Sequence, residues 1–466
     1  MKDNMYKLGN MDIKKLIIKM SLPAMLSMIV QALYNVVDSI FVAKISEQAL
    51  TALSIAFPIQ LIIVSIFVGL GVGINSFMSR KLGEGNKNDA INTAEHGFAI
   101  GIILWIILAI CSAFVPEIFS KLFTDDPVVI KYAVQYTRII MLFSGGSIIA
   151  EVCMNILRST GDMLSSMKIQ LLGAIINIVL DPILIFGLLF FPKLSVQGAA
   201  IATVIGQISA MLYALKLVFR NNNGLKLNLK KFHYSSNITG EIFKVGIPAM
   251  FMQMLGSIMV SGINLILAGF SGTAVAVFGA YFKLQSFIYM PVFGLTQGIM
   301  PIVGYNYGAK NKHRVLETVK YGCIFACAIM LVGTTVFVIF PRQLLMLFNS
   351  TPQMDAIGIE CLRIISIGFV FSGIVIVLST FFQAIGKAKA SLIISFARQI
   401  IILLPLAFVL SKLFGLAGIW IALPISEIVS LIISGYFVIK VYREKIRDLE
   451  GEIQVTSNCD LVKGSQ

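Results

Sequence analysis

Two acidic residues lie inside long apolar stretches of the chain, where a charged side chain is costly. Asp38 lies in the segment YNVVDS at 34–39, and Asp181 lies in the segment NIVLDP at 177–182. Ionisable residues in such surroundings mark ion pathways and proton relays more often than simple structural positions. The chemistry that these two positions indicate is reversible protonation or cation exchange.

Helical spacing places further polar side chains on the same faces as the acids. The three sets are Gln31, Tyr34 and Asp38; Gln170, Asn177 and Asp181; and Thr203 with Gln207. Residues three, four or seven apart lie on one face of a helix. Because a polar face is unfavourable against apolar surroundings, we expect the three faces to converge on one pocket.

Two interpretations of this pocket follow from the residues alone. In the first, Asp38 and Asp181 take up and release protons or a cation during transport. In the second, each acid only ties helices together through hydrogen bonds to Tyr34, Asn177 or Thr203. We expect the first.

Other ionisable residues in apolar stretches are weaker candidates. Glu151 lies two helical turns before Arg158, and its role stays open between structure and function. Glu427 and Arg398 lie near the end of the chain, and we expect them to form a structural buried pair. The chain has no GxxxxGK[ST], HExxH or GxSxG motif, so we expect no enzyme activity, no cofactor and no metal site.

The elements that position these residues are membrane helices. Hydrophobic residues make up 57% of the 466 residues and charged residues only 13%, which excludes a water-soluble globule. The apolar runs are long and unbroken, unlike the alternating strands of a membrane barrel. We predict about twelve spans, at 17–41, 54–79, 93–116, 127–152, 164–190, 196–219, 242–268, 277–303, 317–341, 355–381, 391–411 and 416–439.

An internal repeat divides these spans into two groups of six. At an offset of 225 residues, segment 22–25 aligns with 247–250 and segment 82–87 with 307–312. The same offset aligns Pro116 with Pro341, Pro127 with Pro352 and Gly161 with Gly386. Because six is an even number, both halves start on the same side of the membrane and are parallel repeats.

The repeat and the charges predict the domains and the orientation. We expect a cytoplasmic tail at 1–12, an N-lobe at 13–219, a cytoplasmic linker at 220–240, a C-lobe at 241–445 and a cytoplasmic tail at 446–466. One side of the membrane carries 27 Lys and Arg residues and the other carries 5. Positive residues gather on the cytoplasmic side, so both termini are expected there. The net charge of +14 is thus explained by membrane orientation and by attraction to anionic lipid headgroups. We therefore expect no nucleic acid as a partner.

The chain resembles the MATE family of multidrug and toxic-compound exporters over about residues 12–445, and it is most similar to the DinF-like and MepA-like branches. The segments that carry the resemblance are Leu22-Pro23, 34–38 with Phe41, 79–86, 177–182, 198–203 and 304–309. The resemblance implies twelve helices in two six-helix lobes around a central cavity. It also implies an N-lobe ion-coupling cluster of Asp38, Asn177, Asp181 and Thr203. The C-lobe acids of the NorM-like branch have no counterpart in 256–264 or 372–380.

We therefore expect a monomeric secondary antiporter in a bacterial cell membrane. It would export lipophilic, cationic compounds in exchange for protons or sodium, with Gln31, Tyr34, Gln170 and Gln207 facing the substrate cavity. The alternative is a lipid-linked oligosaccharide flippase of the same superfamily, for which more spans and a basic cavity would be expected.

Overall fold

The computed structural model describes residues 2–43, 45–188, 192–220, 227, 232–348 and 350–449. The side chains of residues 2–4, 34–40 and 42–43 lie outside the description. The described residues form helices joined by short connections and contain no strand. The fold is thus an all-α integral membrane protein.

The first half of the chain contains nine helices among its described residues. They are α1 (Lys2–Asn10), α2 (Ile13–Ala43), α3 (Glu47–Gly83), α4 (Lys87–Cys111), α5 (Val115–Lys121), α6 (Pro127–Leu142), α7 (Gly145–Ser159), α8 (Met163–Phe186) and α9 (Val196–Phe219). Several begin at polar caps whose side chains accept backbone N–H groups, such as Asn86 before α4 and Asp162 before α8. Such caps satisfy donors that the first helical turn leaves without partners.

The second half follows the same order. Its elements are α10 (Ser236–Ala268), α11 (Gly272–Gly308), α12 (Lys312–Ile339), α13 (Pro341–Met346), α14 (Pro352–Ser366), α15 (Phe369–Ala384), α16 (Ala388–Phe396), η3 (Ala397–Leu403), α17 (Leu404–Val441) and η4 (Tyr442–Ile446). The segments η3 and η4 are π-helical. The repeat seen in the sequence therefore reappears as a repeated order of helices.

The described helices account for twelve membrane spans when the bent and broken segments are resolved. Nine described helical segments are long and apolar enough to cross a bilayer, and the pairs α6–α7 and α14–α15 add two more as spans bent by 44° and 47°. The segment Ala388–Ile446 supplies two spans, because its 59 residues break at Gly415, where φ is 61°. A Cβ at Gly418 would lie 2.1 Å from the Leu410 carbonyl oxygen, so the chain turns back on itself there.

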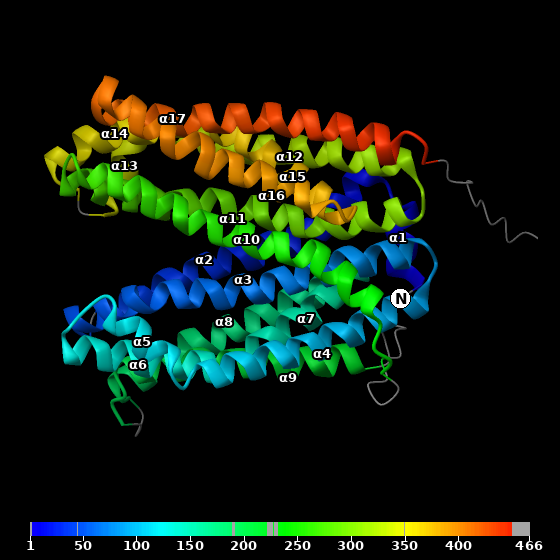
Figure 1. Ribbon diagram of the computed structural model, residues 1–466, viewed down its shortest axis with the longest axis horizontal. Coiled ribbons are helices and arrows are strands. Elements are labelled where there is room, and N and C mark those ends of the chain that lie inside the picture. The colour runs from blue at the N-terminus through cyan, green and yellow to red at the C-terminus, as the bar shows by residue number, and fades with distance from the viewer. Residues whose placement is uncertain are drawn as a thin grey trace, which may run out of the picture.

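The two halves form two lobes that lie side by side with their helices roughly parallel (Figure 1). In each half, the first span packs mainly on the second span of the other half: α2 packs along α11, and α10 packs along α3. Glycines permit both contacts. A Cβ at Gly294 of α11 would lie 2.5 Å from the Met25 Cα, and one at Gly73 of α3 would lie 2.4 Å from the Ile242 oxygen.

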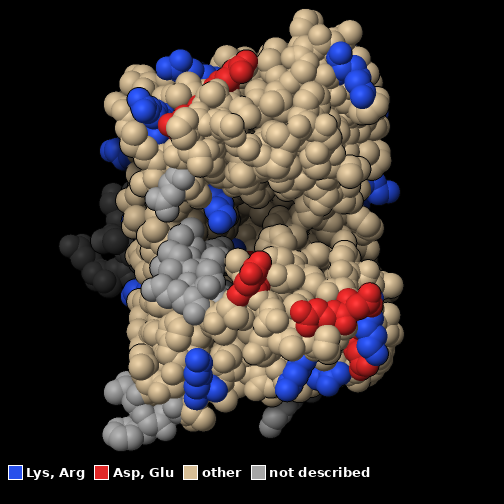
Figure 2. Space-filling model, turned by 90° about the vertical axis from the view of Figure 1, so that its left-hand side faces the viewer, with Lys and Arg blue, Asp and Glu red and all other residues tan. Residues whose placement is uncertain are grey.

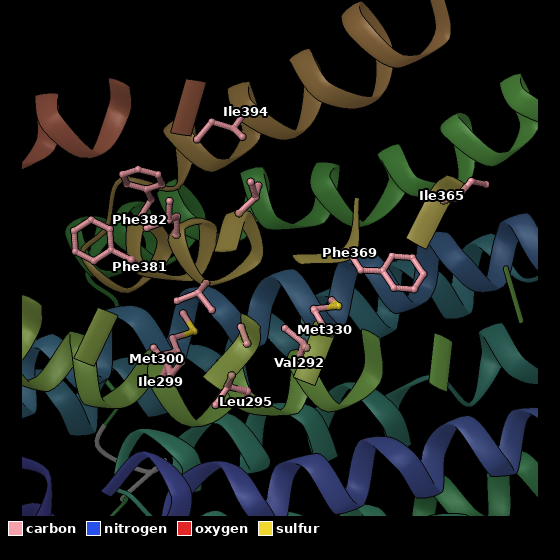
Figure 3. Close-up of a cluster of buried hydrophobic side chains, with 14 of the residues drawn as sticks. Val292, Leu295, Ile299, Met300, Met330, Ile365, Phe369, Phe381, Phe382 and Ile394 are labelled. Atoms are coloured by element: carbon pink, nitrogen blue, oxygen red, sulfur yellow. The ribbon is translucent and has the colours of Figure 1, made fainter. Parts of the chain in front are cut away.

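Apolar side chains fill each lobe. Figure 3 shows part of the larger core, where Met300 and Ile299 of α11 lie near Phe381 and Phe382 of α15, with Ile394 of α16 beyond them. A second core lies among α3, α4, α7 and α9. Between the lobes, the end of the molecule that carries α5 and α13 is hollowed, as Figure 2 shows.

Candidate ion-coupling site

The site begins where α8 and α9 approach each other closely. A Cβ at Gly206 of α9 would lie 2.7 Å from the Gly173 carbonyl oxygen of α8 and 3.3 Å from the Asn177 Cβ. A larger residue at position 206 would push the helices apart. The glycine thus lets short polar side chains of the two helices meet inside the lobe.

Asn177 connects Asp181 to Thr203 at this contact. Its Nδ2 donates to Asp181 Oδ1 at 3.3 Å and to Thr203 Oγ1 at 3.2 Å. With the amide reversed, its nitrogen lies 3.0 Å from Asp181 Oδ2 and its oxygen 3.2 Å from Thr203 Oγ1. The amide bridges the carboxyl and hydroxyl groups in either orientation. In the first orientation the Thr203 hydroxyl accepts from Asn177 and donates its hydrogen to the Ala199 carbonyl oxygen at 3.0 Å.

All three side chains are removed from solvent. Asp181 is fully buried, and Asn177 and Thr203 are 3% and 8% exposed. A buried carboxyl group with hydrogen-bonding neighbours can be held either protonated or ionised with modest rearrangement. The sequence predicted that these three residues lie together, and the structure brings them together.

Glutamines extend the polar face along the same helices. Gln170 of α8 donates from Nε2 to Gln31 Oε1 of α2, so the predicted approach of these two helices is present. The Oε1 atoms of Gln170 and Gln207 are buried without a hydrogen-bond partner. Unpartnered buried acceptors are unfavourable, and they are suited to ligand groups that donate hydrogen bonds.

The predicted contribution of α2 is described only in part. Positions 31 and 38 share a face of α2 by helical periodicity, and Gln31 meets α8. The side chains of Tyr34 and Asp38 lie outside the described residues. Their place in the site stays a prediction.

Glu151 of α7 belongs to a separate network. Its Oε1 accepts from Arg158 Nη1 at 3.2 Å and from Asn155 Nδ2 at 2.7 Å. Arg158 also donates from Nε to Ser166 Oγ of α8 at 2.8 Å, and Asn75 Nδ2 of α3 donates to Asn155 Oδ1 at 3.4 Å. This network connects α7 to α3 and α8. The sequence indicated only Arg158 as a partner of Glu151 and did not predict the others.

The C-lobe contains the predicted pair of Arg398 and Glu427. Arg398 Nη1 of η3 donates to Glu427 Oε1 of α17. Glu427 Oε2 and Arg398 Nε have no further hydrogen-bond partner. A charge pair inside the membrane-spanning part of a lobe fixes η3 against α17, which agrees with a structural role.

The described residues contain no group of three or more His, Cys, Asp or Glu side chains that could hold a metal ion. The site therefore consists of one described carboxyl group with amide and hydroxyl neighbours in the N-lobe. Two six-span lobes flanking a hollow, with a buried ionisable group inside a membrane-spanning helix, are the features of an integral membrane transporter.

The comparisons with known proteins identify the family. A family model described as MatE matches residues 23–183 and again residues 248–409. The two matches fall on the two repeats. The chain belongs to this family of membrane transporters, whose members move small drug substrates and are coupled to ions.

Individual relatives point in the same direction. The chain is 28% identical to the multidrug export protein MepA of Staphylococcus haemolyticus, over 91% of this chain and 93% of the relative. It is 29% identical to a protein of Shewanella oneidensis named FAD transporter, over 89% and 92%. The relatives support a drug exporter as the general function.

Solved structures share the whole fold. One, described as the outward-facing conformation of a multidrug resistance MATE family transporter, has a TM-score of 0.89 and 28% identity, and the match covers 95% of this chain and 98% of that chain. Another, a transporter of the same superfamily from Pyrococcus furiosus described as having a binding pocket of reverse polarity, has a TM-score of 0.88 and 27% identity over 94% and 98%.

Proposed function

We propose that the chain is a secondary antiporter that exports lipophilic, cationic compounds across a bacterial cell membrane in exchange for protons. The observation that carries the proposal is the fully buried Asp181, joined through Asn177 to Thr203 inside the N-lobe. A carboxyl group that gains and loses a proton there changes the charge of the lobe interior. That change can bias the equilibrium between outward-open and inward-open states.

Protons are favoured over sodium by the ligands available. A hard cation needs a nearly complete shell of oxygen ligands. The described site offers the Asp181 carboxylate, the Thr203 hydroxyl and one amide oxygen, and that hydroxyl and amide also bond to each other. Protonation needs only the carboxylate.

The unpartnered oxygens of Gln170 and Gln207 support cationic substrates, since protonated amines donate hydrogen bonds. In the proposed orientation both termini and the linker at 220–240 are cytoplasmic, the lobes comprise 13–219 and 241–445, and the protein acts as a monomer. The hollow in Figure 2 then opens to the outside.

Proteoliposomes test the coupling. An acidic lumen should drive uptake of ethidium, whose permanent charge prevents it from accumulating by pH partition alone. A lumen loaded with sodium at equal pH should not drive uptake. Protein-free liposomes and the Asp181→Asn variant serve as controls. Uptake driven by sodium and insensitive to the pH gradient would overturn proton coupling.

The relative named FAD transporter makes FAD a second substrate to test. Competition of FAD with ethidium at equal concentrations would show that the cavity accepts an anionic dinucleotide. We expect that FAD does not compete with ethidium and that other lipophilic cations do.

A further inference from the structure

The end of α3 near Gly83 lies in the contact between the lobes, although α3 belongs to the first half. Ser76 Oγ donates to the Gln383 carbonyl oxygen at the end of α15, at 2.6 Å. Arg80 Nη2 donates to Glu241 Oε2 of α10, at 3.2 Å. Both partners belong to the second half, so this turn of α3 is fastened to the opposite lobe.

The Arg80 guanidinium is seated against the backbone of the second half. A Cβ at Gly386, which has φ +79°, would lie 2.9–3.0 Å from the guanidinium atoms. Arg80 Nε donates to the Ser76 carbonyl oxygen at 3.3 Å, and the Phe77 ring centroid lies 5.3 Å from Cζ. The side chain is 14% exposed. Arg80 is thus held on several sides and not merely paired at the surface.

Backbone contacts close the same end of the molecule. A Cβ at Gly83 would lie 1.9 Å from the Tyr305 carbonyl oxygen of α11, and one at Gly308 would lie 2.0 Å from the Arg80 carbonyl oxygen. Because even a single added Cβ would overlap the opposite backbone at both positions, no side chain or water fits between the two helices there. The lobes are closed here, while the opposite end is hollowed (Figure 2).

We propose that Arg80 is a latch that holds the lobes together at the end that carries α1, the cytoplasmic end in the proposed orientation. A transporter that loads substrate from the cytoplasm must part its lobes at this end. Arg80 must then leave both Glu241 and Gly386. Because the latch bonds exist only in the closed arrangement, they shift the population toward the outward-open state. The latch does not depend on the identity of the coupling ion.

The surroundings of Glu241 make the latch reversible. Glu241 Oε1 accepts from Lys244 Nζ of its own helix at 2.6 Å. When Arg80 departs, Glu241 keeps a cationic partner, so opening does not leave an unpaired buried carboxylate. Separation therefore breaks the ion pair between Glu241 and Arg80, whereas the ion pair between Glu241 and Lys244 remains.

The neighbouring residue provides a matched control. Lys81 Nζ lies 2.8 Å from Glu84 Oε2 and 3.6 Å from Asp89 Oδ2. Both partners belong to the same lobe as Lys81, so loss of Lys81 removes a charge from the same turn of α3 without touching the contact between lobes.

Spin labels report the opening directly. We suggest labelled cysteines at Asn88 and His313, which are exposed on the two lobes at this end, in protein whose native cysteines are replaced. Distance distributions measured by electron paramagnetic resonance in lipid nanodiscs give the ratio of open to closed molecules. Arg80→Ala and Glu241→Gln should each raise this ratio about tenfold, equivalent to about 1.4 kcal/mol, and Lys81→Ala should leave it unchanged.

The combined variant Arg80→Ala/Glu241→Gln should open no further than Arg80→Ala alone, because the one contact between lobes that Glu241→Gln weakens is already absent without Arg80. If Arg80→Ala fails to fold, Glu241→Gln still tests the latch, because Arg80 keeps its seat at Gly386. Distributions identical to wild type in Glu241→Gln, or equal opening in Lys81→Ala, would overturn the proposal.

Discussion

Replacement of Asp181 by asparagine should separate transport from stability. Two opposing contributions decide the effect on stability. An ionised acid costs about 2.5–3.5 kcal/mol at the centre of a membrane helix on insertion scales, which is an upper bound for Asp181, five residues before the end of α8. An amide avoids most of this cost. The amide oxygen of the variant can still accept the 3.3 Å hydrogen bond from Asn177, but the bond weakens from the about 1.5–3 kcal/mol of a bond to a charged group to the about 0.5–1.5 kcal/mol of a neutral one.

The two contributions oppose each other and the second is the smaller, so the free energy of unfolding should not fall by more than about 1 kcal/mol. Ethidium efflux from cells should nevertheless fall to the level of cells without the protein, because asparagine cannot take up and release a proton. Efflux, membrane abundance and thermal unfolding in detergent are measured on the same preparations. Full efflux at normal abundance would show that Asp181 is a packing residue and that coupling lies elsewhere. Asp38→Asn should behave in the same way.

Three further variants test other features of the molecule. Glu427→Gln should keep most of the efflux, because its amide oxygen can still accept from Arg398. Its free energy of unfolding should fall by less than the value of about 3–5 kcal/mol that is expected when one partner of a buried pair is removed. Loss of efflux at normal abundance would instead make the pair functional. Gly83→Ala should abolish efflux, since its Cβ would lie 1.9 Å from the Tyr305 oxygen and would push α3 away from α11. Gly240→Ala is the matched control, because nothing lies within 4 Å of its Cβ. Equal activity of the two variants would contradict the close approach. In intact cells, a cysteine at Asp125 should react with an impermeant thiol reagent, whereas cysteines at Asn222 and Ser457, positions outside the described residues, should be protected; labelling at Asn222 would reverse the orientation.

The sequence predicted the helices and the doubled architecture because both depend on local or repeated patterns. Apolar length defines a span, and the aligned Pro and Gly residues define the two halves. The pairing of Asn177 with Thr203 was also predictable, because each is a polar residue on an otherwise apolar helix and needs a polar neighbour.

Other features depend on which helix lies opposite, and periodicity contains no such information. Glu241 is 161 residues away from Arg80 in the chain, and the residues around each of them do not predict that the two side chains meet. The bends of 44° and 47° that divide α6–α7 and α14–α15 fall at Ser144-Gly145 and at Gly368, but glycines also lie inside unbroken helices such as α3, so they do not by themselves predict a bend. The π-helical segment Ala397–Leu403 likewise has no distinct composition.

The packing of each half's first span on the other half's second span has a consequence for each half on its own. Because α2 packs along α11 and α10 along α3, a single six-span unit would leave both of these surfaces without a partner. Two copies related by a two-fold axis would cover them, since such an interface is self-complementary. A free six-span unit with this packing would therefore be expected to pair with a second copy of itself. Within one chain the two halves can differ in sequence while they keep this packing, which allows Asp181 to occur in one half without a counterpart in the other.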